Sequence, residues 1–122
     1  MKKMLYVIIF FSSLVMLTAC NSPKFNGSST GNDNQFIMEY RILNTSDYRK
    51  MSLKSGDIID AKVVSKSGSV SVEVKSSDGE VIYVGENIPT TNFDFEIPQD
   101  DTYTFTVTGH KAKGSVSFVK RQ

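Results

Sequence analysis

Hydrophobic and polar side chains alternate in short segments from residue 36 to residue 118. The clearest segment is residues 70–74, in which Val70, Val72 and Val74 alternate with Ser71 and Glu73. Because successive side chains of a β-strand point to opposite faces, this pattern predicts a strand with one buried face. The same two-residue period predicts further strands at residues 36–43, 51–53, 59–63, 81–84, 93–97, 103–107 and 116–118.

Short polar segments separate these predicted strands. Asp78-Gly79 favours a tight hairpin because both residues tolerate a positive φ. We expect further turns at residues 55–57, 66–69, 98–101 and 109–114. About eight short strands with turn signals between them, and no sustained helical period, predict an all-β fold. Two packed sheets suit this number of strands better than one open sheet, so we expect a small antiparallel β-sandwich or barrel.

The inward faces of these strands supply enough large side chains to fill the space between two sheets. The expected core is Phe36, Met38, Ile59, Val63, Val70, Val72, Val74, Phe93, Phe95, Tyr103, Phe105, Val107, Val116 and Phe118.

The start of the chain has a different pattern. Lys2 and Lys3 precede an apolar run that is too short to span a bilayer and is typical of a secretory signal. The run leads to Leu17-Thr18-Ala19-Cys20, which contains the one cysteine of the chain. This segment resembles the bacterial lipobox. The resemblance implies that residues 1–19 are removed and that Cys20 carries lipid, which anchors the protein on the outer side of the cell membrane.

Two acyl chains are enough for stable anchoring, whereas one is marginal. The alternative is an ordinary secreted protein in which Cys20 is a free thiol, and a single cysteine excludes an intramolecular disulfide in either case. Residues 21–34 are mainly Ser, Gly and Asn and predict a flexible tether. The chain is therefore expected to contain a signal peptide at 1–19, a lipidated Cys and tether at 20–34, and a β-sandwich domain at 35–122.

Charge and composition point to no particular ligand. Without Lys2 and Lys3 the chain carries 12 basic and 13 acidic side chains, so nothing suggests a nucleic-acid partner. His110 is the single histidine, and its predicted position in a turn favours an exposed residue over a general base. One histidine and one cysteine cannot form a usual zinc site, so we expect no cofactor or metal.

Two sets of residues are candidates for function. Tyr48 and Tyr83 have polar neighbours, and exposed tyrosines are favoured at binding interfaces. Asp94, Glu96 and Asp100 could form an acidic site, as in a carbohydrate-binding or hydrolytic module. Acids on an outer face or in turns are, however, usually solvated.

Residues 93–118, "FDFEIPQDDTYTFTVTGHKAKGSVSF", alternate through strand, turn and strand. This part resembles the C-terminal half of small jelly-roll sandwiches such as GOLD-like domains, although Asp100 and Asp101 replace the usual turn glycine and the GOLD cysteine pair is absent. The resemblance implies a binding or adaptor role. We therefore expect a non-catalytic envelope lipoprotein with a protein or glycan partner.

Overall fold

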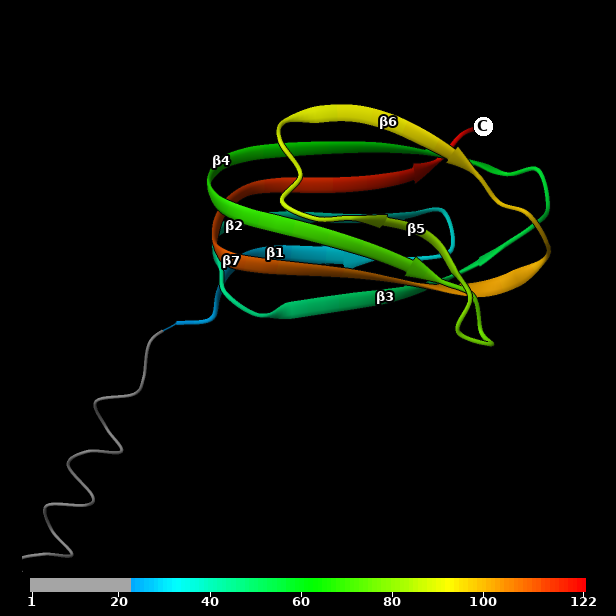
Figure 1. Cartoon of the computed structure of the whole chain (residues 1–122), viewed down its shortest axis with the longest axis horizontal. Helices are drawn as coiled ribbons and strands as arrows, with labels where there is room; N and C mark the ends of the chain where they lie inside the picture. Colours follow the sequence, from blue (N-terminus) through cyan, green and yellow to red (C-terminus); the bar gives the residue numbers. More distant parts are fainter. Residues whose placement is uncertain (1–22) are drawn as a thin grey trace, which may run out of the picture.

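Seven antiparallel strands make up residues 23–122, the part of the chain that the computed structural model describes (Figure 1). The predicted all-β, antiparallel sandwich is confirmed. Cys20 and the expected signal peptide lie outside the described residues. The strands are β1 (Phe25–Gly31), β2 (Gln35–Leu43), β3 (Ser46–Leu53), β4 (Ile58–Lys75), β5 (Val81–Gly85), β6 (Thr91–Glu96) and β7 (Asp101–Lys120).

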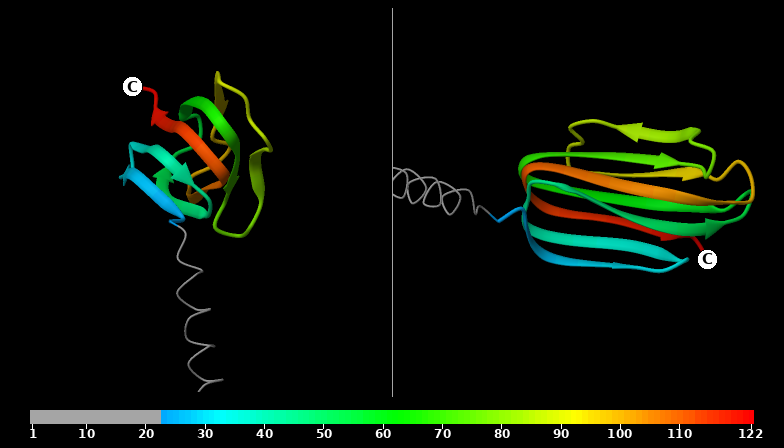
Figure 2. Two further views of the ribbon diagram at one scale, coloured as in Figure 1. Left: turned by 90° about the vertical axis from the view of Figure 1, so that its left-hand side faces the viewer. Right: turned by 90° about the horizontal axis from the view of Figure 1, so that it is seen from below.

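Two long strands, β4 and β7, pass through both layers of the sandwich (Figure 1). The first layer contains β1, β2, the C-terminal half of β7, the N-terminal half of β4 and then β6. The second layer contains β3, the N-terminal half of β7, the C-terminal half of β4 and then β5. Seen along the strands, the β4–β7 ribbon bends from one layer into the other (Figure 2).

The bend occupies the two segments for which the sequence predicted turns, residues 66–69 and 109–114. That prediction is wrong, because the β4–β7 pairing continues through both segments with register shifts. Gly68 has a φ of 69°, Lys111 a φ of 50° and Gly114 a φ of 146°, so the backbone bends sharply while remaining paired. Glycine therefore marks a bend inside each of two strands rather than a break between four.

The tether prediction is also wrong for residues 25–31, which form the edge strand β1 paired with β2. Most β1 side chains are exposed, and the strand adds to the sheet through backbone hydrogen bonds. A strand that buries little apolar surface shows no hydrophobic alternation, which explains why the pattern did not predict it. The domain consequently begins about ten residues earlier than residue 35.

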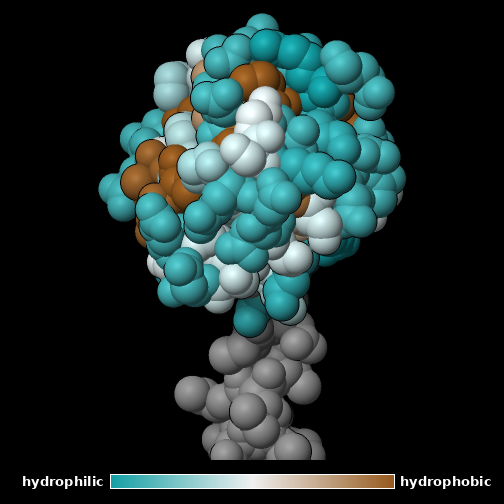
Figure 3. All heavy atoms as spheres, turned by 90° about the vertical axis from the view of Figure 1, so that its right-hand side faces the viewer, coloured by the Kyte–Doolittle hydropathy of each residue, from teal (hydrophilic) through white to brown (hydrophobic). Residues whose placement is uncertain are grey.

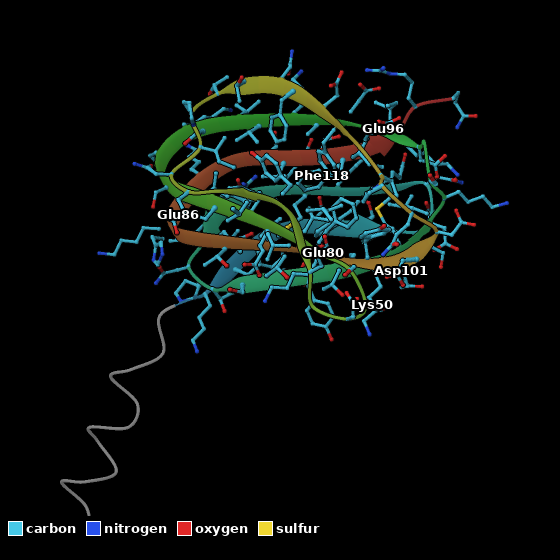
Figure 4. The ribbon with its side chains drawn as sticks, turned by 45° about the vertical axis from the view of Figure 1, so that its right-hand side comes forward. Lys50, Glu80, Glu86, Glu96, Asp101 and Phe118 are labelled. Carbon is cyan, nitrogen blue, oxygen red and sulfur yellow. The ribbon has the colours of Figure 1, made fainter. Side chains whose placement is uncertain are left out.

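One hydrophobic core lies between the layers. Every residue of the expected core is buried except Phe93 and Phe95, which are partly buried against it. Phe105 and Phe118 pack with ring centroids 5.2 Å apart, and Phe36 stacks on Phe118 at 6.2 Å. Phe118 lies between the two layers in Figure 4.

Different contacts close the two open sides of the sandwich. Between the edge strands β1 and β3, the Ser29 hydroxyl donates to Asp47 at 2.7 Å, and Arg49 donates to the Ser29 hydroxyl at 3.1 Å. Between the edge strands β5 and β6, the Tyr83 ring stacks on Phe93 at 4.9 Å and on Phe95 at 5.4 Å. One side is thus closed by polar contacts and the other by aromatic ones.

Two buried tyrosines differ in whether the hydroxyl has a hydrogen-bond partner, and this difference predicts opposite effects on stability when the hydroxyl is removed. The Tyr103 hydroxyl donates to the Gln99 carbonyl oxygen, whereas the buried Tyr40 hydroxyl has no hydrogen-bond partner among residues 23–122. We expect Tyr103→Phe to lower the free energy of unfolding by about 1 kcal/mol and Tyr40→Phe to raise it by a similar amount. Burial raises the pKa of Tyr40 to about 12, whereas the ordinary tyrosine pKa is 10. The unfolded chain therefore ionises first, so stability decreases as the pH rises above 10. Urea unfolding of both variants checks the signs, and a loss of stability in both would contradict this account.

Candidate functional site

The outer surface of the second layer carries three of the four large hydrophobic residues exposed among residues 23–122, and we call it the hydroxyl face. Tyr103, Phe105 and Val107 of β7 point inward, so the residues between them point outward. The face combines short hydroxyl side chains with three larger apolar or aromatic ones. It also holds three charged residues, of which Glu73 and Lys75 form an ion pair. Its members are Ser46, Tyr48, Lys50, Ser52, Ser71, Glu73, Lys75, Val81, Val84, Thr102, Thr104, Thr106 and Thr108.

Strand pairing places Tyr48 and Val84 in one row across this face. Tyr48 pairs with Thr106, Thr106 pairs with Glu73, and Glu73 pairs with Val84. Tyr48 is 58% exposed and Val84 is 57% exposed. A shallow hollow of about 250 Å³ lies in the row between Thr106, Glu73 and Val84. The row therefore offers apolar contacts at both ends and polar groups between them.

Free hydroxyls occupy the centre of the face. Ser46 and Thr108 hydrogen-bond each other at 2.7 Å near one end of it. Within residues 23–122, by contrast, the hydroxyls of Tyr48, Thr104 and Thr106 have no hydrogen-bond partner. A partly apolar surface whose central hydroxyls make no hydrogen bond inside the domain suits a partner that supplies both apolar contacts and hydrogen bonds.

The structure does not bring the two candidate tyrosines together. Tyr48 lies on the hydroxyl face, whereas Tyr83 points to the inner side of β5, opposite Val74. Burial against Phe93 and Phe95 raises the pKa of Tyr83. Tyr48 therefore keeps its candidacy for binding, and Tyr83 has a packing role that already accounts for its aromatic ring.

The three acidic candidates belong to separate local arrangements. Asp94 shares Arg121 with Asp60, since the guanidinium donates to Asp94 at 2.9 Å and to Asp60 at 2.5 Å. The Arg121 hydrogen bond holds the pKa of Asp60 below its usual value. Asp100 accepts a hydrogen bond from the Ser55 amide at 2.8 Å in the β6–β7 connection. Glu96 is exposed at the end of β6.

Other acids at this end of the sandwich stabilise turns. The hydrogen bond from the Ser77 hydroxyl and the amides of Ser77 and Thr102 lower the pKa of Asp101. The Ser76 hydroxyl is the main cause of the lowered pKa of Asp78. Figure 3, which views this end, shows a mainly hydrophilic surface with a few apolar patches.

These lowered pKa values predict a dependence of stability on acidity. A carboxyl group whose folded-state pKa is depressed stabilises the fold above its ordinary pKa of 3.8, and this contribution disappears as the pH falls further. We expect the urea midpoint to decrease as the pH falls through 3.8, and to decrease less in Asp101→Asn. Unfolding curves across this range check the prediction, and an unchanged pH dependence in the variant would contradict it.

Residues 23–122 contain no cluster of three or more potential metal ligands of the His, Cys, Asp and Glu types. They also contain no helix long and apolar enough to cross a membrane. His110 is exposed at the bend of β7.

The hydroxyl face as a unit was not predictable from the sequence. Thr102, Thr104, Thr106 and Thr108 alternate with the expected core residues of that strand, which indicates one outward row. Its neighbours were not predictable, because the pairing of β7 with β3 and β4 depends on the topology of the sandwich.

Comparisons with known proteins give similarities of fold alone. No protein-family model matches this chain, and no curated protein matches its sequence. Aeromonas hydrophila PliG, a periplasmic inhibitor of g-type lysozyme, is 13% identical over 84% of this chain and 90% of its own, with a TM-score of 0.49. A carbohydrate-binding module from Cellvibrio mixtus lichenase 5A is 14% identical over 84% and 91%, with a TM-score of 0.41. A cupin domain from Bordetella pertussis is 10% identical over 84% and 98%, with a TM-score of 0.37.

Proposed function

We propose that this chain is a non-catalytic binding module, held at the outer side of a bacterial cell membrane by lipid on Cys20, whose hydroxyl face binds an envelope protein. The observation that carries the proposal is the position of the exposed apolar side chains. Of the four large hydrophobic residues exposed among residues 23–122, Tyr48, Val81 and Val84 lie on this face, and Phe25 does not. Exposed aromatic and aliphatic groups beside hydroxyls are typical of protein interfaces.

A carbohydrate-binding or hydrolytic module near Asp94, Glu96 and Asp100 is the alternative function. A hydrolytic site needs carboxyl groups that converge on one substrate position and are free to contact it. Asp94 is engaged by Arg121, and Asp100 accepts the Ser55 amide in a different connection, so the acids serve separate local contacts. The geometry therefore supports the binding module better.

Site-specific photo-crosslinking in intact cells tests the binding face. We expect a photoreactive amino acid at Tyr48 to yield a defined crosslinked product that the added substitution Val84→Glu abolishes. The matched control places the same amino acid at Asn92, an exposed position on β6 in the first layer. Equal products from both positions, or a product at Tyr48 that Val84→Glu leaves unchanged, would contradict the proposal.

The anchor is tested separately by Cys20→Ser. We expect this precursor to remain unprocessed or to lose its acyl chains, with release of the protein from membranes. The measurement is intact mass together with membrane fractionation. Unchanged mass and unchanged membrane retention would contradict lipidation without affecting the proposal for the hydroxyl face.

A further inference from the structure

The two ends of the sandwich carry opposite charges. The acidic end holds the β1–β2, β3–β4, β4–β5 and β6–β7 connections, which contain Asp33, Asp57, Asp78, Glu80 and Asp100 but only Lys54 among cations. Glu96 and Asp101 lie toward this end in Figure 4, and Glu86 lies at the other. We call that other end, which contains the start of the described chain, the basic end. Its exposed cations are Lys24, Arg41, Lys66, Lys111 and Lys113.

Backbone contacts bring the basic residues together from different parts of the chain. The Asn44 amide donates to the Lys24 carbonyl oxygen, and the Asn44 side chain accepts from the Lys111 amide. Leu43 pairs with Ala112, and Gly68 lies against the Lys111 backbone. The basic end is therefore a product of the fold, because the bend of the β4–β7 ribbon meets the start of β1 there.

The charged groups of the two ends differ in what they contact. Four of the five acids at the acidic end, all except Glu80, have internal partners. Asp33 accepts from the Ser52 amide, Asp57 from the Lys54 amide and Asp100 from the Ser55 amide. None of the five cations of the basic end makes a side-chain hydrogen bond or ion pair within residues 23–122. Turn stability accounts for those acids, whereas no contact inside the domain accounts for the cations.

Three of the cations surround a hollow of about 580 Å³ beside the bend. Arg41 comes from β2, Lys66 from β4 and Lys113 from β7, with Glu39 as the one acidic residue of the lining. The lining of this hollow has a net positive charge, and its cations come from three strands that the sandwich holds in place. Such a hollow attracts an anionic group.

We infer that the basic end docks on a membrane surface of anionic lipids. The inference rests on the lipid anchor proposed for Cys20. The structured domain begins at Phe25, and five residues of extended chain span at most about 18 Å. The anchor would thus hold the start of β1, which lies at the basic end, within about two Debye lengths of the headgroups even with these five residues fully extended. Each lysine or arginine close to such a surface strengthens attachment about fivefold.

This orientation would direct the acidic end away from the bilayer and leave the hydroxyl face exposed along the side of the molecule. The test uses the full chain with its native N-terminal modification, reconstituted in phosphatidylcholine vesicles with or without phosphatidylglycerol. A water-soluble lysine reagent and mass spectrometry then measure the labelling rate of each lysine on the outer surface. Lys50, Lys54 and Lys120 lie away from the basic end and act as internal controls.

We expect phosphatidylglycerol to slow labelling of Lys24, Lys66, Lys111 and Lys113 about fivefold, with no change at the three control lysines. High salt should reverse the protection. The triple variant Lys66→Glu, Lys111→Glu, Lys113→Glu should remove the protection of Lys24. The matched variant Lys50→Glu, Lys54→Glu, Lys120→Glu carries the same change in net charge and should retain it.

Three results would overturn the inference: equal labelling in the two vesicle types, protection that persists without anionic lipid, or equal loss of protection in both triple variants. Protection without anionic lipid would point to contact with another protein copy. A chain that leaves both kinds of vesicle contradicts the anchor and the docking together. A chain retained on both with unchanged labelling contradicts the docking alone, and the crosslinking at Tyr48 remains an independent test of the proposed function.

Discussion

Phe105→Ala is expected to lower the free energy of unfolding by about 3–5 kcal/mol. The Phe105 side chain is fully buried and packs against two aromatic rings, Phe118 of the other half of β7 at a centroid distance of 5.2 Å and Phe95 of β6 at 6.3 Å. Its removal leaves a cavity at the centre of the sandwich, where neither layer can move inward because β4 and β7 belong to both. A domain of this size has a total stability of about 5–15 kcal/mol, so the loss is a large fraction of it.

Thr106→Ala is the control for this substitution, since Thr106 is the next residue of β7 and points outward. We expect it to change stability by less than about 0.5 kcal/mol. Urea unfolding followed by far-ultraviolet circular dichroism measures both variants. Similar losses in the two would show that the strand, and not the aromatic core, determines the stability of this region.

Gly114→Ala is the second large expected effect, with a loss of about 2–5 kcal/mol. Gly114 has a φ of 146°, and a Cβ atom added there would overlap the carbonyl oxygen of Val64. The alanine must therefore move the backbone where β7 bends against β4. Gly79→Ala is a matched control, because Gly79 also has a positive φ, of 91°, but has no atom within 4 Å of an added Cβ.

We expect Gly79→Ala to cost about 1 kcal/mol, which is the conformational part of the effect alone. The difference between the two alanine variants then measures how tightly the bend is packed. Thermal and urea unfolding of both variants give this difference. Equal losses would contradict the close contact between Gly114 and Val64.

Alternation predicted the strands that bury one face, and it succeeded because burial is what creates the pattern. Phe36, Val72 and Phe118 are buried as expected. The same logic explains both errors. β1 buries little apolar surface and therefore has no pattern, and the glycines of the β4–β7 bend have the composition of a turn although the pairing continues.

The candidate sites were predictable only in part, because a site depends on which strands become neighbours. The sequence identified Tyr48 as a candidate, and the structure places it on an exposed face. It also grouped Tyr83 with Tyr48 and Asp94 with Asp100. The strand that contains Tyr83 turns that ring inward, and Arg121, 27 residues beyond Asp94, contacts that carboxylate. Such long-range neighbours leave no mark on the local spacing of residues.

The position of β7 also constrains the order in which the chain can fold. Before β7 is available, β1 and β2 can pair with each other and β4 can pair with β5 and β6, but β3 has no pairing partner. These pieces join only through β7, which pairs with β2, β3 and β4. The sandwich therefore assembles after the last strand has been synthesised, in a slow step dominated by contacts between distant residues. A growing chain that lacks β7 stays incompletely folded.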